Sequence, residues 1–152
     1  MAVALSRDSR DFRRATTDSV ELALIAADLE DVQGIKAHLE EASDLAREVL
    51  PQKLSQQILH SLESAFGLLE LCVGGKVSFG EAMRLWDEAK EFLPEKLCRL
   101  VEEDPDLEQR MTHFANLYAP DDFLPEEHLE DIRGMCYRLI KKWQAYILET
   151  SI

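Results

Sequence analysis

Three stretches of the chain carry apolar residues at alternating steps of three and four, a spacing that keeps one face of an α-helix apolar because the backbone turns about 100° per residue. They are Ile25, Val32, Ile35, Leu39, Ala42, Ala46 and Val49; Ile58, Leu62, Ala65, Leu69 and Cys72; and Leu129, Ile132, Cys136, Leu139, Trp143 and Tyr146. No stretch of useful length alternates as a β-strand would. The sequence therefore predicts an all-α fold: a single-domain bundle of five to six helices, with up-down packing and long first and last helices.

The first helix is expected to begin at Asp18, with Glu21 completing a capping box, and to end before Pro51. A straight helix of that length would measure ~50 Å, whereas a compact domain of this size is ~38 Å across. Gly34 weakens helices, so we expect a kink or short break there. Otherwise the helix overhangs the bundle and pairs with a second subunit.

Capping residues and prolines set the later boundaries. Gly74 and Gly75 end a second helix, Ser78 with Glu81 opens a third, and Asp104 caps another before Pro105. The third helix is expected to turn Phe92 inward. The second helix is expected over about residues 52–73, and the third runs from Ser78 to a corner at Pro94. A short helix follows through Leu97, Leu100 and Val101, the next runs from Asp104–Pro105 to about residue 118, and the last covers about 125–149. The segment 119–125 is the one expected true loop.

The 152 residues fit one domain and are enough to bury a core without disulfides or metal. Residues 1–16 show no clear apolar period, and their arginines outnumber their acids. We therefore divide the chain into a flexible basic N-terminal arm over 1–16 and a helical bundle domain over 17–150. Alternatively, the arm docks on an acidic face of this chain or of a partner.

The net charge is −13, and residues 81–131 carry sixteen acidic against five basic side chains. Such a surface repels phosphate backbones, which excludes nucleic acid as an expected partner. It favours another protein with a basic surface. No apolar run reaches the ~18 residues that suggest a membrane-spanning helix, so no membrane contact is expected.

The three cysteines, Cys72, Cys98 and Cys136, are widely separated, and the N-terminal apolar run is too short for a secretory leader. An odd number of cysteines in that setting indicates free thiols in a reducing compartment, so a cytoplasmic location is expected.

The motifs of common catalytic and metal sites are missing from the sequence. No two histidines lie four residues apart, and no histidine follows a glutamate by three, so neither the zinc nor the di-iron helix motif is present. The Gly74–Ser78 segment lacks the spacing of a phosphate-binding loop. We expect no cofactor, no metal and no catalytic constellation, although an enzyme site assembled from distant residues stays open as an alternative.

His60 is the one residue for which the sequence supports a specific functional hypothesis. The helical period places it opposite the apolar face, with Gln56, Ser64 and Gly67 around it. The stretch from His60 to Leu69 resembles histidine phosphotransfer domains, which are helical bundles with an exposed phospho-accepting histidine. The match consists of His60, Leu62 and Gly67. Where that family has a lysine and a glycine, this chain has Glu63 and Ser64. The resemblance implies His60 as a phospho-acceptor.

The leading hypothesis is a non-catalytic protein–protein interaction module: an adaptor, chaperone-like or regulatory bundle with an acidic surface. The overhanging first helix and the loop are the candidate contact surfaces, and a basic patch on the last helix is an alternative site for an acidic partner or for the acidic face of a second copy. The loop offers Tyr118, Phe123 and Leu124 among acids, and the last helix offers Arg138 and Lys141 as a basic patch. A basic protein or a second copy of the chain, giving a homodimer, is the expected partner. Phosphotransfer through His60 is the first alternative.

Overall fold

The computed structural model describes residues 2–149, with side chains described for 13–48, 50–107 and 109–149. That part of the chain forms seven helices and no strand: α1 (Ala2–Asp28), α2 (Val32–Val49), α3 (Gln52–Gly74), α4 (Phe79–Lys90), α5 (Glu95–Glu102), α6 (Pro105–Ala115) and α7 (Glu126–Glu149). The prediction of an all-α single domain is confirmed. The expected number of helices was too small, because the first predicted helix is two helices.

The break between α1 and α2 lies at residues 29–31, before the predicted position at Gly34. Glu30 adopts a positive φ of 58°, which reverses the chain. Asp31 then caps α2, because its Oδ1 accepts a hydrogen bond from the Gly34 amide at 3.0 Å. A Cβ at Gly34 would lie 2.5 Å from Asp31 Oδ2. Gly34 therefore makes room for the cap that starts α2 and does not mark a kink.

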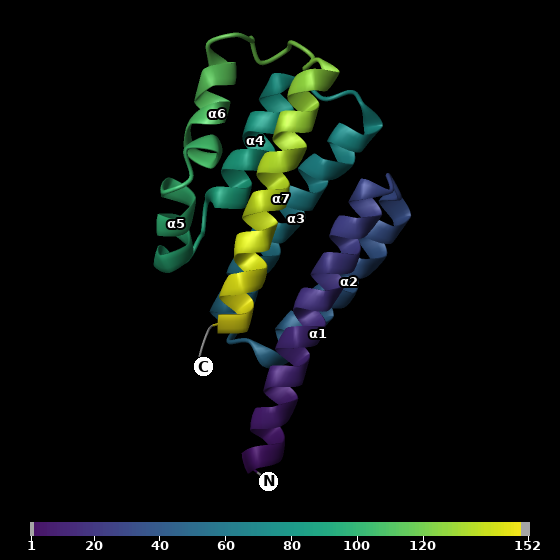
Figure 1. Cartoon of the computed structure of the whole chain (residues 1–152), viewed down its shortest axis with the longest axis vertical. Coiled ribbons are helices and arrows are strands. Elements are labelled where there is room, and N and C mark those ends of the chain that lie inside the picture. Colours follow the sequence, from purple (N-terminus) through teal and green to yellow (C-terminus); the bar gives the residue numbers. More distant parts are fainter. Residues whose placement is uncertain (1, 150–152) are drawn as a thin grey trace.

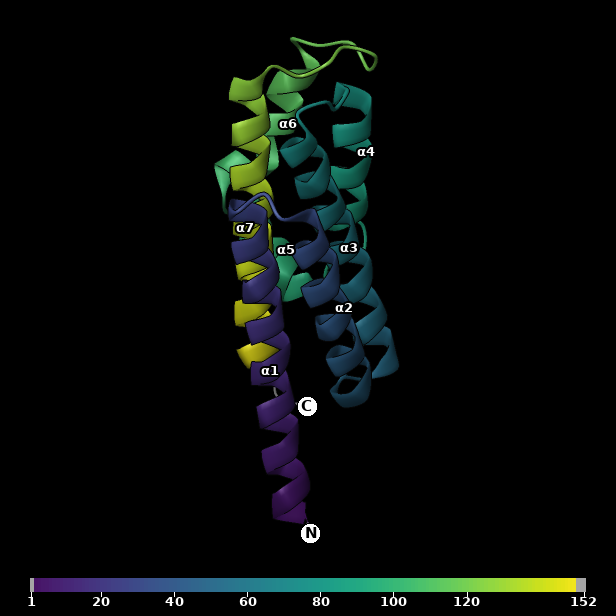
Figure 2. The ribbon, with the colours of Figure 1, turned by 90° about the vertical axis from the view of Figure 1, so that its right-hand side faces the viewer.

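The start of the first helix was also predicted wrongly. The helix begins at Ala2, sixteen residues before Asp18, so residues 2–16 of the predicted arm belong to α1. Asp18 lies within a continuous helix and caps nothing. The N-terminal half of α1 projects beyond the bundle (Figures 1 and 2).

The long last helix, α7, packs against α1, α3, α5 and α6, while α1 pairs with α2, and α3 with α4 (Figure 1). The core between these helices contains Trp86 on α4 and Trp143 on α7, both almost fully buried. Phe66 on α3 and Phe114 on α6 are buried in the same core. The apolar stripes read from the sequence on the second and last helices are the faces that meet here.

A tight connection fixes the start of α4. Gly75 ends α3 with a positive φ of 77°, and the Ser78 hydroxyl caps α4 by accepting from the Glu81 amide at 3.3 Å. The predicted helix start with Ser78 as N-cap is confirmed. The loop before α7 lies against this turn, because Phe79 N donates to Asp122 O at 2.8 Å and Leu124 N donates to Val77 O at 3.0 Å.

Within residues 2–149, no helix combines the length and apolar character needed to cross a lipid bilayer.

Candidate functional site

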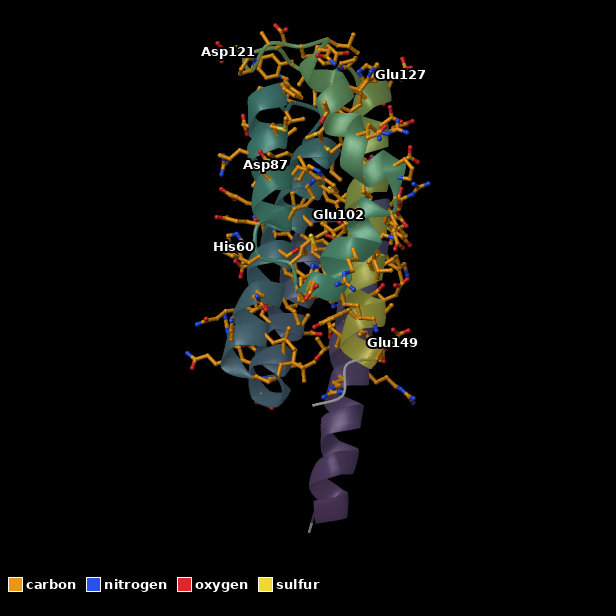
Figure 3. The ribbon with its side chains drawn as sticks, turned by 90° about the vertical axis from the view of Figure 1, so that its left-hand side faces the viewer. His60, Asp87, Glu102, Asp121, Glu127 and Glu149 are labelled. Carbon is orange, nitrogen blue, oxygen red and sulfur yellow. The ribbon has the colours of Figure 1, made fainter. Side chains whose placement is uncertain are left out.

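His60 lies at the edge of a hollow of about 370 Å³ lined by residues of α3 and by one aromatic side chain that follows α4 (Figure 3). The lining residues are Lys53, Gln56, Gln57, His60 and Phe92. The His60 and Phe92 rings are tilted, with centroids 5.3 Å apart. The prediction that Phe92 points inward is wrong, because α4 ends at Lys90 and leaves this ring 52% exposed.

The His60 side chain is 38% exposed, so it is half-buried rather than fully open to water. Its Nε2 atom is buried without a hydrogen-bond partner, and Glu91 Oε2 lies 3.4 Å away. The cover comes from the end of α4, where Glu91 and Phe92 pack over α3. The helical period predicted a fully exposed His60, and that prediction is wrong because the period carries no information about this neighbouring segment.

Of the three residues predicted to surround His60, only Gln56 lines the hollow. Ser64 is buried between α3 and α4, where its hydroxyl lies 3.5 Å from Glu88 Oε2. Gly67 faces open space. Lys53 and Phe92 were missed as members of the site. Lys53 is two helical turns before His60, a spacing that could have indicated a shared face.

The surroundings of Nε2 bear on the phosphotransfer alternative. A phosphoryl group approaching this nitrogen would meet the Glu91 carboxylate, which is of like charge and occupies the adjacent space. The other ring nitrogen, Nδ1, is the remaining acceptor. A histidine beside a carboxylate is also part of the arrangement that the enzyme alternative requires, but the residues lining the hollow include no hydroxyl or thiol nucleophile.

A second depression, which we name the α4 groove, runs along the outer side of α4 and has a volume of about 550 Å³. It is lined by Phe79, Gly80, Met83, Arg84, Asp87, Glu88, Glu91 and Pro120. Arg84 is paired with Glu88 at 3.1 Å, and the rim also carries the carboxylates of Asp87 and Glu91. Glu91 also contacts His60, so the groove and the His60 hollow adjoin along one edge (Figure 3).

The predicted loop surface is only partly exposed. Phe123 is 69% exposed on the loop that also supplies Pro120 to the α4 groove, whereas Leu124 is buried. The expectation that Leu124 is available for contact is therefore wrong, because its amide is tied to Val77 and its side chain joins the core. Tyr118 is half-buried, and its hydroxyl lies 2.6 Å from His128 Nδ1.

The predicted basic patch on α7 is engaged within the chain. Arg138 contacts Asp106 at 2.7 Å and Asp104 at 3.4 Å, and Lys141 bonds Glu21. The hydrogen bonds from Arg110 and Arg138 lower the pKa of the Asp106 carboxyl below its usual value. Both candidate residues thus fasten α7 to α6 or α1.

Two of the cysteines, Cys72 on α3 and Cys136 on α7, are buried. Burial raises the pKa of the Cys72 thiol to about 12 and that of Cys136 well above its usual value. All three cysteines are free. Among the described side chains, no group of three or more histidine, cysteine, aspartate or glutamate residues is placed to hold a metal ion.

Comparisons with family models, with curated proteins and with solved structures found no match to this chain.

Proposed function

We propose that this protein is a non-catalytic protein–protein interaction module that binds a basic, amphipathic segment of another protein along the α4 groove. The observation that carries this proposal is the composition of the groove. Phe79, Met83 and Pro120 form an apolar floor, and Asp87 and Glu91 stand on the rim. A helix or extended segment with apolar residues on one side and Lys or Arg on the other complements both features.

Two exposed aromatic side chains lie on segments next to this surface. Phe123 is on the loop that supplies Pro120 to the groove, and Phe92 follows the groove residue Glu91 and lines the His60 hollow. Aromatic anchors surrounded by polar residues are typical of the energetic centres of interfaces. The His60 hollow beside Phe92 offers a second, mixed polar and apolar receptor for a side chain of the bound segment.

The charge distribution supports a basic partner. The segment from Glu81 to Asp131, which contains α4 and the loop, holds most of the acidic excess of the chain. Long-range attraction of this kind increases association rates and is screened by salt. Binding at the groove should therefore weaken as ionic strength rises.

A photo-crosslinking residue placed at Met83 tests the proposal in lysate of the source cells, with the same residue placed at Lys36 on α2 as the matched control. The Met83 probe should capture a discrete protein through a segment rich in Lys and Arg, and the Lys36 probe should not. Asp87→Lys with Glu91→Lys should abolish the capture. Capture that survives these charge reversals, or that occurs equally at Lys36, contradicts the proposal.

A separate labelling assay tests the phosphotransfer alternative. Incubation with phosphorylated receiver domains should leave both the wild type and His60→Gln unlabelled if the protein only docks partners. Label on the wild type that is lost in His60→Gln would replace the interaction proposal with phosphotransfer.

A further inference from the structure

An unpartnered apolar stripe runs along the outward face of α1, on a different side of the molecule from the α4 groove. Leu22 and Ile25 of α1, and Leu29 directly after it, lie at steps of three and four residues and are 44%, 45% and 74% exposed. The opposite face of α1 contributes Val20, Leu24 and Ala27 to the core. Helix α1 is thus apolar on two faces, and the chain itself covers only one of them.

We propose that a second copy of this chain covers the outward face of α1, giving an antiparallel homodimer in which each copy's Arg14 meets an acidic hollow on the other. An isologous two-fold contact brings a stripe against itself, so apolar side chains meet apolar side chains. With the axis beside Ile25, Leu22 of one copy lies opposite Leu29 of the other. This proposal does not depend on the proposed function.

Charge decides between the two orientations. The outward positions that precede Leu22 among the described side chains are Arg14 and Asp18, by the same helical period. A parallel pair would set each of these charges level with its own copy, which is unfavourable. The antiparallel pair sends the charged half of each α1 past the end of its partner's α1.

The acidic hollow lies where that charged half would arrive. It has a volume of about 290 Å³ at the end of α1, and its rim carries Glu30, Glu126 and Glu130 against the single cation Arg133. Arg133 donates to the carbonyl of Ala27 at 3.2 Å and lies 3.9 Å from Glu30, so part of this acidic charge has no basic partner in the hollow.

The distances along the helix axis bring Arg14 of one copy to the level of the acidic hollow of the other. Arg14 lies eleven residues before Ile25, which is ~16 Å from the proposed axis. On the partner, Arg133 is level with Ala27, and Glu126 lies seven residues further along α7, which is ~13 Å beyond the level of Ile25. The difference is smaller than the reach of an arginine side chain. Figure 2 shows the first turns of α7 extending past the end of α1.

Arg14 and the hollow also lie on matching sides of their helices. Arg14 lies seven residues before Glu21, so both are on the same side of α1, and Glu21 bonds Lys141 of α7. The two-fold operation keeps that side facing the partner's α7. Glu130 lies eleven residues before Lys141, about three turns, and so faces the same way on α7.

The size of the contact sets its strength. The outward face of α1 from Arg14 to Leu29 is a single helix face ~24 Å long. This supplies part of the ~800 Å² per copy that a stable interface buries, and the charged contacts at the two hollows supply the rest. We therefore expect a dimer that dissociates in the micromolar range.

Sedimentation equilibrium of the full chain, from low to high micromolar concentration, tests the proposal. The wild type should pass from monomer to dimer, and Ile25→Glu should raise the dissociation constant at least ~10-fold. Leu117→Glu, at an exposed leucine after α6, is the matched control and should leave dimerisation unchanged. A wild type that stays monomeric throughout, or a dimer unaffected by Ile25→Glu, overturns the proposal.

Charge exchange tests the second contact. Arg14→Glu should weaken the dimer ~5-fold, and adding Glu130→Arg should restore it, because each substitution replaces one sign by the other at the same contact. Arg99→Glu, on the remote helix α5, is the control. A double variant weaker than both single variants contradicts the placement of Arg14 at the hollow.

Disulfide trapping tests the orientation in a Cys98→Ser background, since the other two cysteines are buried. Leu22→Cys mixed with Leu29→Cys should form the mixed disulfide in preference to either symmetric one. A symmetric Leu22→Cys disulfide formed in preference would show a parallel pair and overturn the antiparallel arrangement. Circular dichroism checks that every variant remains helical.

Discussion

The hydroxyl of Ser61, the neighbour of His60, links three helices inside the core. It donates to the carbonyl oxygen of Ala89 on α4 at 2.6 Å and accepts from Trp143 Nε1 on α7 at 2.6 Å. All of these atoms are buried, so no water replaces a lost bond. The apolar period places residue 61 beside the core, but only the meeting of three helices gives its hydroxyl two partners.

We expect Ser61→Ala to destabilise the protein by about 1–3 kcal/mol, because it leaves the Trp143 indole N–H unsatisfied in the core. Urea unfolding measures the change. Ser43→Ala is the matched control: its hydroxyl is also buried, but it bonds the Leu39 carbonyl of its own helix, and its removal should cost less. Equal costs at the two serines would contradict the role of Ser61 as a link between helices.

Glu21 should make the stability depend on pH in the acid range. The hydrogen bond from Lys141, followed by one from Gln144, lowers the pKa of Glu21 in the folded protein against the opposing effect of burial. A depressed folded pKa favours the folded state above the unfolded-state value near ~4.3, and this contribution is lost as pH falls through the folded pKa.

Glu21→Gln should therefore be less stable than the wild type at neutral pH, with the difference shrinking as pH falls below ~4. Thermal unfolding across that range measures it. A difference that stays constant with pH would mean that the carboxylate charge does not contribute.

At the scale of elements, the contact between the start of α4 and the loop before α7 depends on a glycine that has no room for a side chain. A Cβ on Gly80 would lie 2.9 Å from the carbonyl oxygen of Pro120, which also accepts the Gly80 amide. This contact holds the loop over the start of α4 and positions Phe123.

Gly80→Ala should cost about 1–3 kcal/mol and loosen the loop, because backbone must shift to accept the methyl group. Gly67→Ala in α3 should instead stabilise the protein by up to about 1 kcal/mol, because its Cβ meets open space and alanine favours the helix. Chemical denaturation of both variants measures the contrast. Destabilisation by both would contradict the assigned surroundings.

Local sequence features predicted helix boundaries correctly where a single cap, glycine or proline sets the boundary. The ends of α3, the Ser78 cap and the Asp104–Pro105 start all lie where capping and backbone rules place them. The rules failed for α1. Asp18 and Glu21 have the spacing of a capping box, but helix α1 continues through them, and Glu21 instead bonds α7.

At the scale of the whole molecule, the net charge of −13 should oppose folding by self-repulsion. Most ion pairs in the structure are exposed, and such pairs contribute at most about 1 kcal/mol each. Moderate NaCl should therefore raise the melting temperature at neutral pH, because screening of the overall repulsion outweighs screening of the pairs.

Differential scanning calorimetry at low and moderate salt measures this effect. A variant carrying Glu103→Lys and Asp121→Lys, both exposed, should gain less from salt because less repulsion remains. A melting temperature that falls with salt would mean that the exposed pairs dominate.

The sequence by itself determined the all-α class, most helix boundaries and the buried faces of α3 and α7, because periodicity and capping act over a few neighbouring residues. Only the tertiary structure decided what surrounds His60, that Phe92 is exposed and Leu124 buried, and that the α4 groove and the outward face of α1 are open. These properties depend on which segments distant in the chain pack together, and the spacing of residues within one helix does not encode its neighbours.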